Sequence, residues 1–245
     1  MVLAGGSGTR VGAGRNKVYL PLAGRPVLAW SLATFARMPE IGPLVLVVRP
    51  ADRALARELL RADPDLAHRA DVRLVDGGAS RQESELEGLR VLAGRIAAGE
   101  VDAVLVHDGA RPLVTAALAR EVLAVARAHG GAVPGVPCAD LAAVAPQEPD
   151  VRPVTQSDAS VVPVGERLTA AGPDLVAVQT PQGFRAAPLL AACEAAVRHG
   201  FVGTDTASCV ERFGSLSTRW VPADAGNIKI TYPHDLRLAA SRLGG

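Results

Sequence analysis

Aromatic side chains, lysine, cysteine and long hydrophobic runs are all scarce in this 245-residue sequence. Aromatic residues make up 3% of it, so the core must be built mainly from alanine, valine and leucine. The three cysteines, Cys138, Cys193 and Cys209, are far apart and form no C-x-x-C pair, which argues against a disulfide framework or a zinc cluster. No run approaches the roughly 20 apolar residues of a membrane span, and the first residues lack the layout of a signal peptide. We therefore expect a globular protein of the reducing cytoplasm that binds no membrane.

The charges of the chain almost cancel, because 26 lysines and arginines stand against 25 aspartates and glutamates. This balance argues against nucleic acid or an anionic membrane surface as a partner, since both attract basic proteins. Hydrophobic residues at 49% and charged residues at 21% are typical of a folded chain and exclude a disordered one. Two of the basic residues are lysines, Lys17 and Lys229, and the other 24 are arginines. Since lysine supplies a compact point charge, these two positions are candidates for a specific role.

Short apolar runs alternate with amphipathic stretches along most of the chain, a pattern typical of βα units. Strands are expected at 1–4, 44–48, 72–75, 103–106, 218–221 and 227–231. Helices are expected at 26–38, from Thr115 onward, and at 187–199, 204–213 and 234–243. The run at 44–48 is apolar throughout, as in a parallel strand that is covered on both faces. We therefore predict an α/β fold with a Rossmann-like, mainly parallel sheet flanked by helices.

The segment from 132 to 181 breaks this alternation. It is rich in proline and valine and shows hardly any helical periodicity, which suits an extended hairpin or arm better than a flexible linker. No internal repeat and no clean boundary separates it from the rest of the chain. We therefore predict one domain over residues 1–245, with an inserted arm at about 137–176.

A glycine-rich segment follows the first predicted strand directly, where glycines let backbone N–H groups approach a phosphate. Its residues are Ala4, Gly5, Gly6, Ser7, Gly8 and Thr9. Val11 stands where a dinucleotide fingerprint needs a small residue, and the chain lacks the Gly-Lys pair of a P-loop. A tight turn without a ligand is the alternative. Arg10 and Lys17 favour a ligand, because two cations beside an amide-lined loop form a site for a polyphosphate.

Five further motifs follow in order along nearly the whole chain. They are VDGGASRQES at 75–84, VHDGARP at 106–112, QTPQGF at 179–184, TDTAS at 204–208 and NIKIT at 227–231. Together with AGGSGTR at 4–10 and KVYL at 17–20, they resemble the 2-C-methyl-D-erythritol 4-phosphate cytidylyltransferase family, within the sugar-nucleotide-type nucleotidyltransferases. The shared order of all these motifs carries the resemblance, because any one of them alone is weak evidence.

The resemblance implies a fold, a reaction and a cofactor. The fold is that of a nucleotidyltransferase with an extended β-arm for dimerisation, and the partner is a second copy of the chain. In the reaction, the phosphate of 2-C-methyl-D-erythritol 4-phosphate attacks the α-phosphorus of CTP, and pyrophosphate leaves. The product, 4-diphosphocytidyl-2-C-methyl-D-erythritol, is an isoprenoid precursor of the non-mevalonate pathway. Because charge spreads over phosphoryl oxygens, such catalysis depends on well-placed cations and on Mg²⁺.

The same resemblance implies roles for individual residues. The catalytic group would contain Arg10, Lys17, Arg167 and Lys229. The nucleotide would be bound by Ala4, Gly5, Gly6, Ser7, Gly8, Thr9, Gly78, Arg81, Ser84, Asp108 and Gly109. The acceptor would be bound by Asp108, Arg111, Thr204 and Lys229. Asp108 would also hold the metal ion, because it follows a strand at the edge where α/β sheets bind ligands.

Several of these residues have simpler explanations. Asp108 could cap the next helix, and Arg81 could be a solvated helix residue. Asp76 and Asp205 are expected to be caps or turn formers, and we assign no role to His107. The three cysteines are expected to be small buried hydrophobic residues, since none has a histidine partner nearby in sequence.

The predicted arm departs from the family pattern at positions that would recognise the acceptor. Asp140 is followed by Leu141 where the resemblance implies a threonine, and Gly172 stands where it implies an arginine supplied across the dimer. Arg167 is the nearest candidate to replace that arginine. The acceptor is therefore open, with ribitol 5-phosphate, another phosphorylated polyol or a phosphonate as alternatives. A catalytically silent nucleotide-binding protein is a weaker alternative, because the catalytic cations and Asp108 are all retained.

Overall fold

The structure is a computed structural model that describes residues 1–6, 16–67, 69, 71–138, 142–144, 168–170 and 175–244. The chain divides into two compact units, Met1–Gly135 with Val178–Gly245, and Val136–Ala177. In the second unit, β8 (Ala142–Val144) pairs antiparallel with β9 (Leu168–Ala170). The role of this segment in dimerisation, expected from the sequence, stays a prediction.

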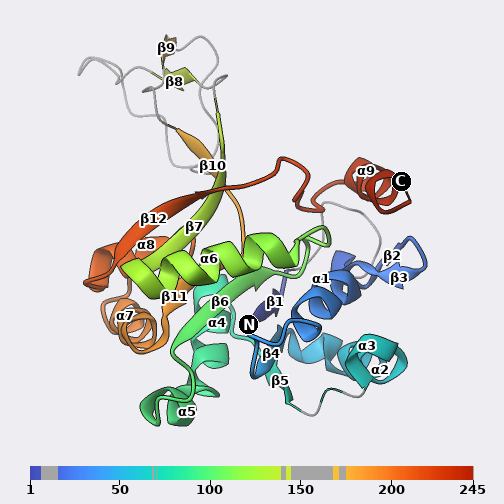
Figure 1. Cartoon of the computed structure of the whole chain (residues 1–245), viewed down its shortest axis with the longest axis horizontal. Helices are drawn as coiled ribbons and strands as arrows, with labels where there is room; N and C mark the ends of the chain where they lie inside the picture. The colour runs from blue at the N-terminus through green and yellow to red at the C-terminus, as the bar shows by residue number, and fades with distance from the viewer. Residues whose placement is uncertain are drawn as a thin grey trace, which may run out of the picture. The chain divides into compact units, whose positions relative to one another are not determined.

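The main sheet has eight strands (Figure 1), with neighbours in the order β10, β7, β11, β6, β1, β4 and β5, and with β12 beside β7. Their bounds are β1 (Val2–Ala4), β4 (Leu44–Val48), β5 (Val72–Asp76), β6 (Ala103–Asp108), β7 (Gly130–Pro137), β10 (Val176–Val178), β11 (Gln182–Arg185) and β12 (Ser217–Pro222). Strands β5, β4, β1 and β6 run parallel, and β11 runs antiparallel to both β6 and β7. The mainly parallel α/β fold expected from the sequence is therefore confirmed.

Strand β4 is buried on both faces, which explains why its sequence is apolar at every position. Leu44, Leu46 and Val48 belong to one hydrophobic cluster, whereas Val45 and Val47 belong to a second cluster. Successive strand residues point to opposite faces of a sheet, so the two clusters lie on its two sides. All five side chains are at most 1% exposed. A strand that is covered on both faces forms a near-continuous hydrophobic run.

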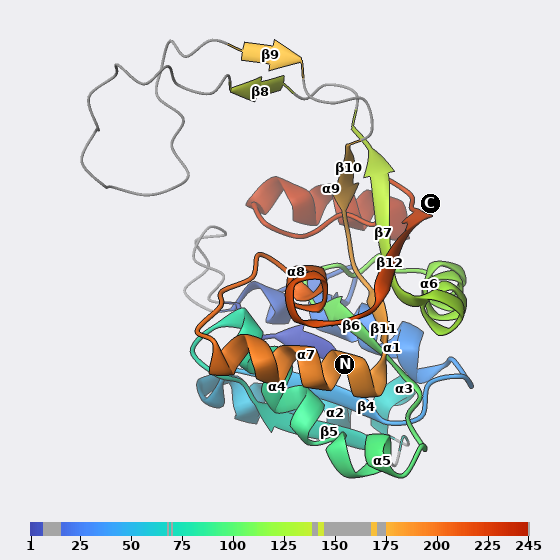
Figure 2. The same cartoon turned by 90° about the vertical axis from the view of Figure 1, so that its left-hand side faces the viewer.

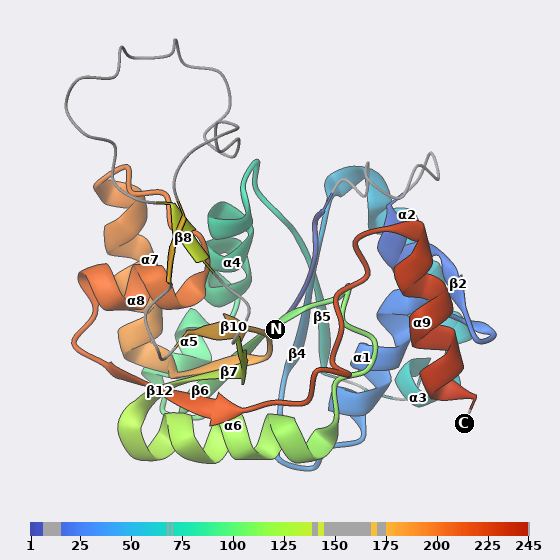
Figure 3. The ribbon, with the colours of Figure 1, turned by 90° about the horizontal axis from the view of Figure 1, so that it is seen from above.

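Helices cover both faces of the sheet, as two perpendicular views show (Figures 2 and 3). Helices α1, α2, α3 and α6 supply residues to the first cluster, and α4, α5, α7 and α8 supply the second. The helices are α1 (Val27–Ala36), α2 (Arg53–Ala62), α3 (Pro64–Ala67), α4 (Arg81–Arg90), α5 (Ala93–Ala97), α6 (Ala116–His129), α7 (Ala186–Arg198), α8 (Thr206–Phe213) and α9 (Pro233–Leu243). None of these described helices is both long and apolar enough to cross a membrane.

Side-chain caps fix the starts of several helices. Thr115, where a helix was expected to begin, caps α6, because its Oγ1 accepts a hydrogen bond from the Leu118 N–H at 3.2 Å. Asp205 caps α8 by accepting from the Ser208 N–H at 3.0 Å, which confirms its expected capping role. Ser80 caps α4 in a reciprocal capping box, so the polar start of this helix is fixed beside the strands.

The strand expected at 227–231 is wrong. The segment is irregular, although the Ile230 N–H donates to the Ala110 carbonyl at 2.8 Å. Its alternating apolar residues, Ile228 and Ile230, instead join a small cluster with Ala239 of α9 and with Leu22. Leu22 belongs to β2 (Pro21–Leu22), which pairs with β3 (Arg25–Pro26). The alternation that suggested a strand therefore arises from packing against a helix.

The parallel strands end together at one edge of the sheet. Strand β1 ends at Ala4, opposite Val48 of β4, and its Leu3 lies opposite Asp108, the last residue of β6. In open α/β sheets, ligands bind at the carboxyl ends of the strands. The fold thus brings the start of the glycine-rich segment and the end of β6 side by side at this edge.

Candidate active site

A cavity of about 290 Å³ lies at the carboxyl ends of β1 and β6, within the first unit. Its described lining comes from the end of β1, the first glycines after it, the start of the 3₁₀ helix at Lys17, the residues before and at the start of α4, the end of β6 and the segment before α9. The lining residues are Leu3, Ala4, Gly5, Gly6, Lys17, Val18, Gly78, Ala79, Ser80, Arg81, Ser84, Asp108, Ala110, Lys229 and Thr231. Among these described residues, three are cations and one is a carboxylate, so the cavity favours an anionic ligand.

Lys17 is placed by the residue that precedes it. The side-chain amide of Asn16 donates to the Ala4 carbonyl at 2.8 Å and to Asp52 Oδ2 at 2.9 Å. Asp52 also accepts from Arg49 Nε at 2.7 Å, which holds the carboxylate in place. Asn16 is 1% exposed. Its hydrogen bond to Ala4 ties the short 3₁₀ helix that begins at Lys17 to the end of β1. Asn16 therefore joins the residues at Lys17 to Ala4, the first residue of the glycine-rich segment, beside the cavity.

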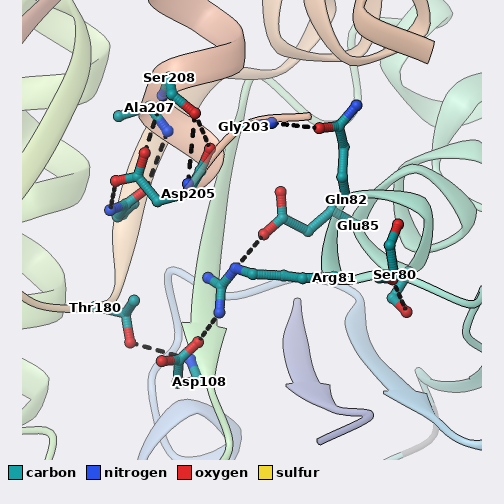
Figure 4. Close-up of polar contacts among 12 residues, drawn as sticks. Ser80, Arg81, Gln82, Glu85, Asp108, Thr180, Gly203, Asp205, Ala207 and Ser208 are labelled. Atoms are coloured by element: carbon teal, nitrogen blue, oxygen red, sulfur yellow. Dashed lines mark hydrogen bonds and ion pairs between the residues drawn. The ribbon is translucent and has the colours of Figure 1, made fainter. Parts of the chain in front are cut away.

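Asp108 is the electrostatic centre of the cavity. Its Oδ1 accepts a hydrogen bond from Arg81 Nη1 (Figure 4), and Lys229 Nζ lies 2.7 Å from its Oδ2. Burial alone would raise the pKa of Asp108, but Arg81 and Lys229 outweigh burial and hold the pKa far below its usual range. Asp108 is therefore ionised at neutral pH. Its pairing with two cations accounts for it better than helix capping, and Arg81 is not a merely solvated residue.

Glu85 of α4 is a buried acid that the sequence analysis missed. Arg81 Nε lies 2.9 Å from Glu85 Oε1, so one guanidinium joins Glu85 to Asp108 (Figure 4). Burial raises the pKa of Glu85 to about 7, and the neighbouring Arg81 opposes this rise. The spacing of four residues between Arg81 and Glu85 was the available signal, because it places both side chains on one face of a helix.

His107, to which we assigned no role, helps to hold the backbone of Asp108. Burial lowers the pKa of His107 to about 3, so the ring is neutral. Its Nε2–H donates to the Arg111 carbonyl at 3.1 Å, which leaves Nδ1 to accept from the Thr180 hydroxyl at 3.2 Å. The Thr180 oxygen in turn accepts from the Asp108 N–H at 3.0 Å. With these donors, both ring nitrogens of His107, the Thr180 hydroxyl and the Asp108 N–H are all paired, and together they fix the end of β6.

Contacts of Asn227 hold the segment that carries Lys229. The Asn227 side-chain amide donates to Gln179 Oε1 at 2.8 Å and to the Thr180 carbonyl at 2.9 Å. Arg111 Nη1 donates to the Asn227 carbonyl at 2.7 Å. Arg111 therefore supports the segment beside the cavity and is not among the described lining residues.

Two glutamines hold the chain before α8. Gln182 Nε2 donates to Asp205 Oδ2 at 2.8 Å. Gln82 Oε1 accepts from the Gly203 N–H at 3.0 Å, as Figure 4 shows. Thr204 lies between these two anchored positions and is exposed. It is not part of the described lining of the cavity.

The structure brings many of the predicted site residues together and leaves others apart. Those at the cavity are Ala4, Gly5, Gly6, Lys17, Gly78, Arg81, Ser84, Asp108 and Lys229. Those absent from its described lining are Gly109, Arg111 and Thr204. Those outside the described residues are Ser7, Gly8, Thr9, Arg10 and Arg167, together with Asp140, Leu141 and Gly172. The individual roles of all these residues stay predictions.

Gly109 has a packing reason to be glycine. Its N–H donates to the Leu3 carbonyl at 2.8 Å, and a Cβ atom would lie 3.0 Å from that same oxygen and 2.7 Å from Leu28 Cδ1. A side chain at this position would push β6 away from β1. The glycine therefore serves the close approach of two strands at the edge of the cavity.

Several lining residues were not predicted. They are Leu3, Val18, Ala79, Ser80, Ala110 and Thr231. Each lies within two positions of a predicted site residue in the sequence, so neighbouring positions in the same motifs were the signal. No side-chain chemistry marked most of them, because apolar residues line a cavity through shape alone.

The cysteines behave as the sequence predicts at two of their three positions. Cys193 and Cys209 are buried, and burial raises the pKa of both thiols, to about 11 for Cys209. Both are therefore neutral packing residues at physiological pH. Cys138 is partly exposed, which the prediction of a buried residue did not anticipate.

Comparisons with known proteins agree with this arrangement. Residues 1–244 match the profile of the family described as IspD, 2-C-methyl-D-erythritol 4-phosphate cytidylyltransferase. The chain is 38% identical over 239 residues to the enzyme of that name from Geobacter metallireducens, which covers 98% of this chain and 94% of the relative. It is 37% identical over 243 residues to the enzyme of that name from Geobacillus kaustophilus, and the match covers 99% of this chain and 95% of the relative. The crystal structure of the Thermus thermophilus protein of the same name superposes with a TM-score of 0.69 at 28% identity, covering 100% of this chain and 98% of that one.

Replacing Glu85 by glutamine should change how stability depends on pH. The folded chain keeps the Glu85 proton up to about pH 7, whereas the unfolded chain releases it near the ordinary value of 4.5. Between these values the folded state binds more protons, so the free energy of unfolding falls as pH rises. Glu85→Gln lacks this loss and should gain stability relative to the parent chain between about pH 5 and about pH 8. Denaturant unfolding of both proteins at the two pH values measures this, and an unchanged difference would contradict the raised pKa.

Proposed function

The chain belongs to the 2-C-methyl-D-erythritol 4-phosphate cytidylyltransferase family, and we propose that it transfers the cytidylyl group of CTP to that acceptor. A phosphate oxygen of the acceptor attacks the α-phosphorus of CTP. A new P–O bond forms, the bond from the α-phosphorus to the oxygen of the β-phosphate breaks, and pyrophosphate leaves. The products are 4-diphosphocytidyl-2-C-methyl-D-erythritol and pyrophosphate.

The observation that carries this proposal is the charge arrangement at the cavity. Lys17, Arg81 and Lys229 come from three separate parts of the sequence and line the same space, with Asp108 between two of them. Both substrates are anionic, and the transition state spreads negative charge over phosphoryl oxygens. Cations that are already placed in a partly enclosed cavity stabilise that charge without rearrangement.

The proposed roles follow the positions of the side chains. Lys17 stabilises the α-phosphoryl group and the leaving pyrophosphate, together with Arg10 from the glycine-rich segment. Arg81 and its neighbours at the start of α4, Gly78 and Ser84, bind the cytidine part. Lys229 neutralises the acceptor phosphate. Support for this division comes from the lining itself, where Lys17 and Arg81 lie on different segments around Asp108.

The residues at the cavity fit a magnesium ion. Mg²⁺ is commonly held by one or two carboxylates together with substrate phosphates and water. In the described part of the chain, no group of three or more histidine, cysteine or acidic side chains could hold a metal by itself. Asp108 is the carboxylate of the described lining, and it is ionised. We propose that Asp108 holds Mg²⁺ jointly with the triphosphate, where the ion would neutralise phosphoryl oxygens.

Comparison of a panel of substrates tests the function directly. Release of pyrophosphate should be fast with CTP and 2-C-methyl-D-erythritol 4-phosphate in the presence of Mg²⁺, and chelation of the metal should abolish it. UTP, ATP and GTP replace CTP in one series, and ribitol 5-phosphate replaces the acceptor in another. Equal or better turnover with UTP or GTP would refute the cytidylyl donor. Better turnover with ribitol 5-phosphate would refute the acceptor alone.

A location in the cytoplasm stays a prediction.

Replacing Lys17 by alanine should lower turnover with little change in stability. Removing a charge that acts on the transition state typically costs about 100-fold or more in rate. Pyrophosphate release and thermal unfolding of the same preparations measure both effects, and Lys17→Arg, which restores a positive charge, should recover part of the rate. If Lys17→Ala lowers the unfolding temperature strongly, Lys17 has a structural role. If Lys17→Ala leaves the rate unchanged, Lys17 is a solvated residue.

We further propose that the chain acts as a homodimer in which Arg167 reaches the acceptor site of the partner subunit. The argument is the length and composition of the predicted arm, whose ordering needs a partner surface. An arginine can bind a phosphate through two hydrogen bonds and thereby orient it. Mixing the inactive variants Lys17→Ala and Arg167→Ala after subunit exchange should restore one complete site per mixed dimer. No recovery despite demonstrated exchange would mean that Arg167 serves its own subunit or no site.

A further inference from the structure

The buried acid Glu85 has no part in the proposed reaction, although it lies directly behind the cavity. It belongs to α4, is 2% exposed and is not among the described lining residues. A buried carboxylate loses its hydration, which is costly unless a cation or hydrogen bonds replace the water. Its presence therefore depends on a specific partner.

That partner is Arg81, one helical turn earlier. Arg81 Nε lies 2.9 Å from Glu85 Oε1, and Nη1 of the same guanidinium donates to Asp108 (Figure 4). The planar guanidinium is thus held at two of its nitrogen atoms, by a carboxylate from its own helix and by one from β6. Because an arginine side chain has considerable rotamer freedom, holding it at two points removes that freedom before a ligand binds.

The other surroundings of Glu85 do not require a carboxylate. Cys193 of α7 and Cys209 of α8 are near enough for the charge of Glu85 to raise the pKa of both thiols, and both are neutral. The charge of Asp108 opposes the ionisation of Glu85. Two neighbours favour a negative charge at this position, the Arg81 guanidinium and the hydroxyl of Thr206 in α8, and of the two Arg81 is the charged group.

We infer that Glu85 is a positioning residue, which holds the Arg81 guanidinium in place for the nucleotide in the cavity. The inference rests on the proposed function, because it takes Arg81 as part of the nucleotide site. Asp108 is shared between Arg81, Lys229 and the proposed metal ion, so its hold on Arg81 changes when ligands bind. Glu85 lies outside the lining, so a ligand in the cavity does not compete directly for its contact with Arg81 Nε.

The stability of a Glu85→Gln variant, compared with that of the parent chain, distinguishes a positioning role from a structural one. Burial disfavours the ionised form of Glu85, so a neutral glutamine should leave the fold at least as stable above neutral pH. A residue that only stabilised α4 would give the opposite result. Glu85 thus exchanges stability for the placement of a functional side chain, as active sites commonly do.

The experiment compares Glu85→Gln and Glu85→Leu with a control on the same helix. Glu87 is an exposed acid whose Oε1 lies 2.7 Å from Arg90 Nη1, and Glu87→Gln should leave activity unchanged. The measurements, at about pH 8, are the equilibrium affinity for CTP, the KM for CTP, kcat and the unfolding temperature. We expect Glu85→Gln to weaken CTP binding about tenfold, and Glu85→Leu to weaken it further. KM for CTP should rise more than kcat falls, and the unfolding temperature should not drop.

An Arg81→Gln background shows whether Glu85 acts through Arg81. If it does, adding Glu85→Gln to Arg81→Gln changes the affinity for CTP no further, because the side chain to be positioned is already gone. The Glu85→Gln loss measured in the parent chain should therefore disappear in this background.

Three outcomes overturn the inference. The first is an unchanged CTP affinity in both Glu85 variants. The second is an equal loss of CTP affinity when Glu85→Gln is added to the parent chain and to Arg81→Gln. The third is a loss of CTP affinity that accompanies a lower unfolding temperature. Turnover by the parent chain tests the proposed function separately. The CTP affinities keep their meaning even when the acceptor proves to be a different phosphorylated compound.

Discussion

The carboxylate of Asp108, held between Arg81 and Lys229, is the interaction on which the rest of the site depends. It joins the start of α4, the end of β6 and the segment before α9, which lie far apart in the sequence. A buried carboxylate with two cations is ionised and well paired, whereas the two cations would repel each other without it. The cavity can therefore hold several positive charges close together before an anionic ligand arrives.

The fold supplies this carboxylate at a defined place. Both faces of β4 are covered by helices, and β6 lies beside β1 through the close approach at Gly109. The hydrogen bonds from the Asp108 N–H to Thr180, and from Thr180 to His107, then fix the last residue of β6. Packing of the sheet and orientation of the charged group are thus parts of one continuous set of contacts.

Sequence periodicity predicted the elements whose pattern reflects their own burial, such as the uniformly apolar β4 and the Thr115-capped α6. It failed at 227–231, because packing against a helix produces the same alternation as a strand. Through their resemblance to the family, the motifs predicted Lys17, Arg81, Asp108 and Lys229 at one site, and all four line the same cavity. For Asp108, the position at the end of a parallel strand was a second signal. The motifs missed Glu85 and His107, whose contacts depend on which face of α4 and β6 is buried. Sequence order does not reveal those contacts.

The affinity for CTP, measured with and without Mg²⁺ in the parent chain and in Asp108→Asn, tests the central role of Asp108 most directly. In the parent chain, Mg²⁺ should tighten CTP binding, because Asp108 and the triphosphate hold the ion together. Without Mg²⁺, Asp108→Asn should bind CTP more weakly than the parent chain, because its carboxylate no longer holds the Arg81 and Lys229 charges in place before the ligand binds. Adding Mg²⁺ should then improve its binding little. An equal gain from Mg²⁺ in both proteins would contradict the account.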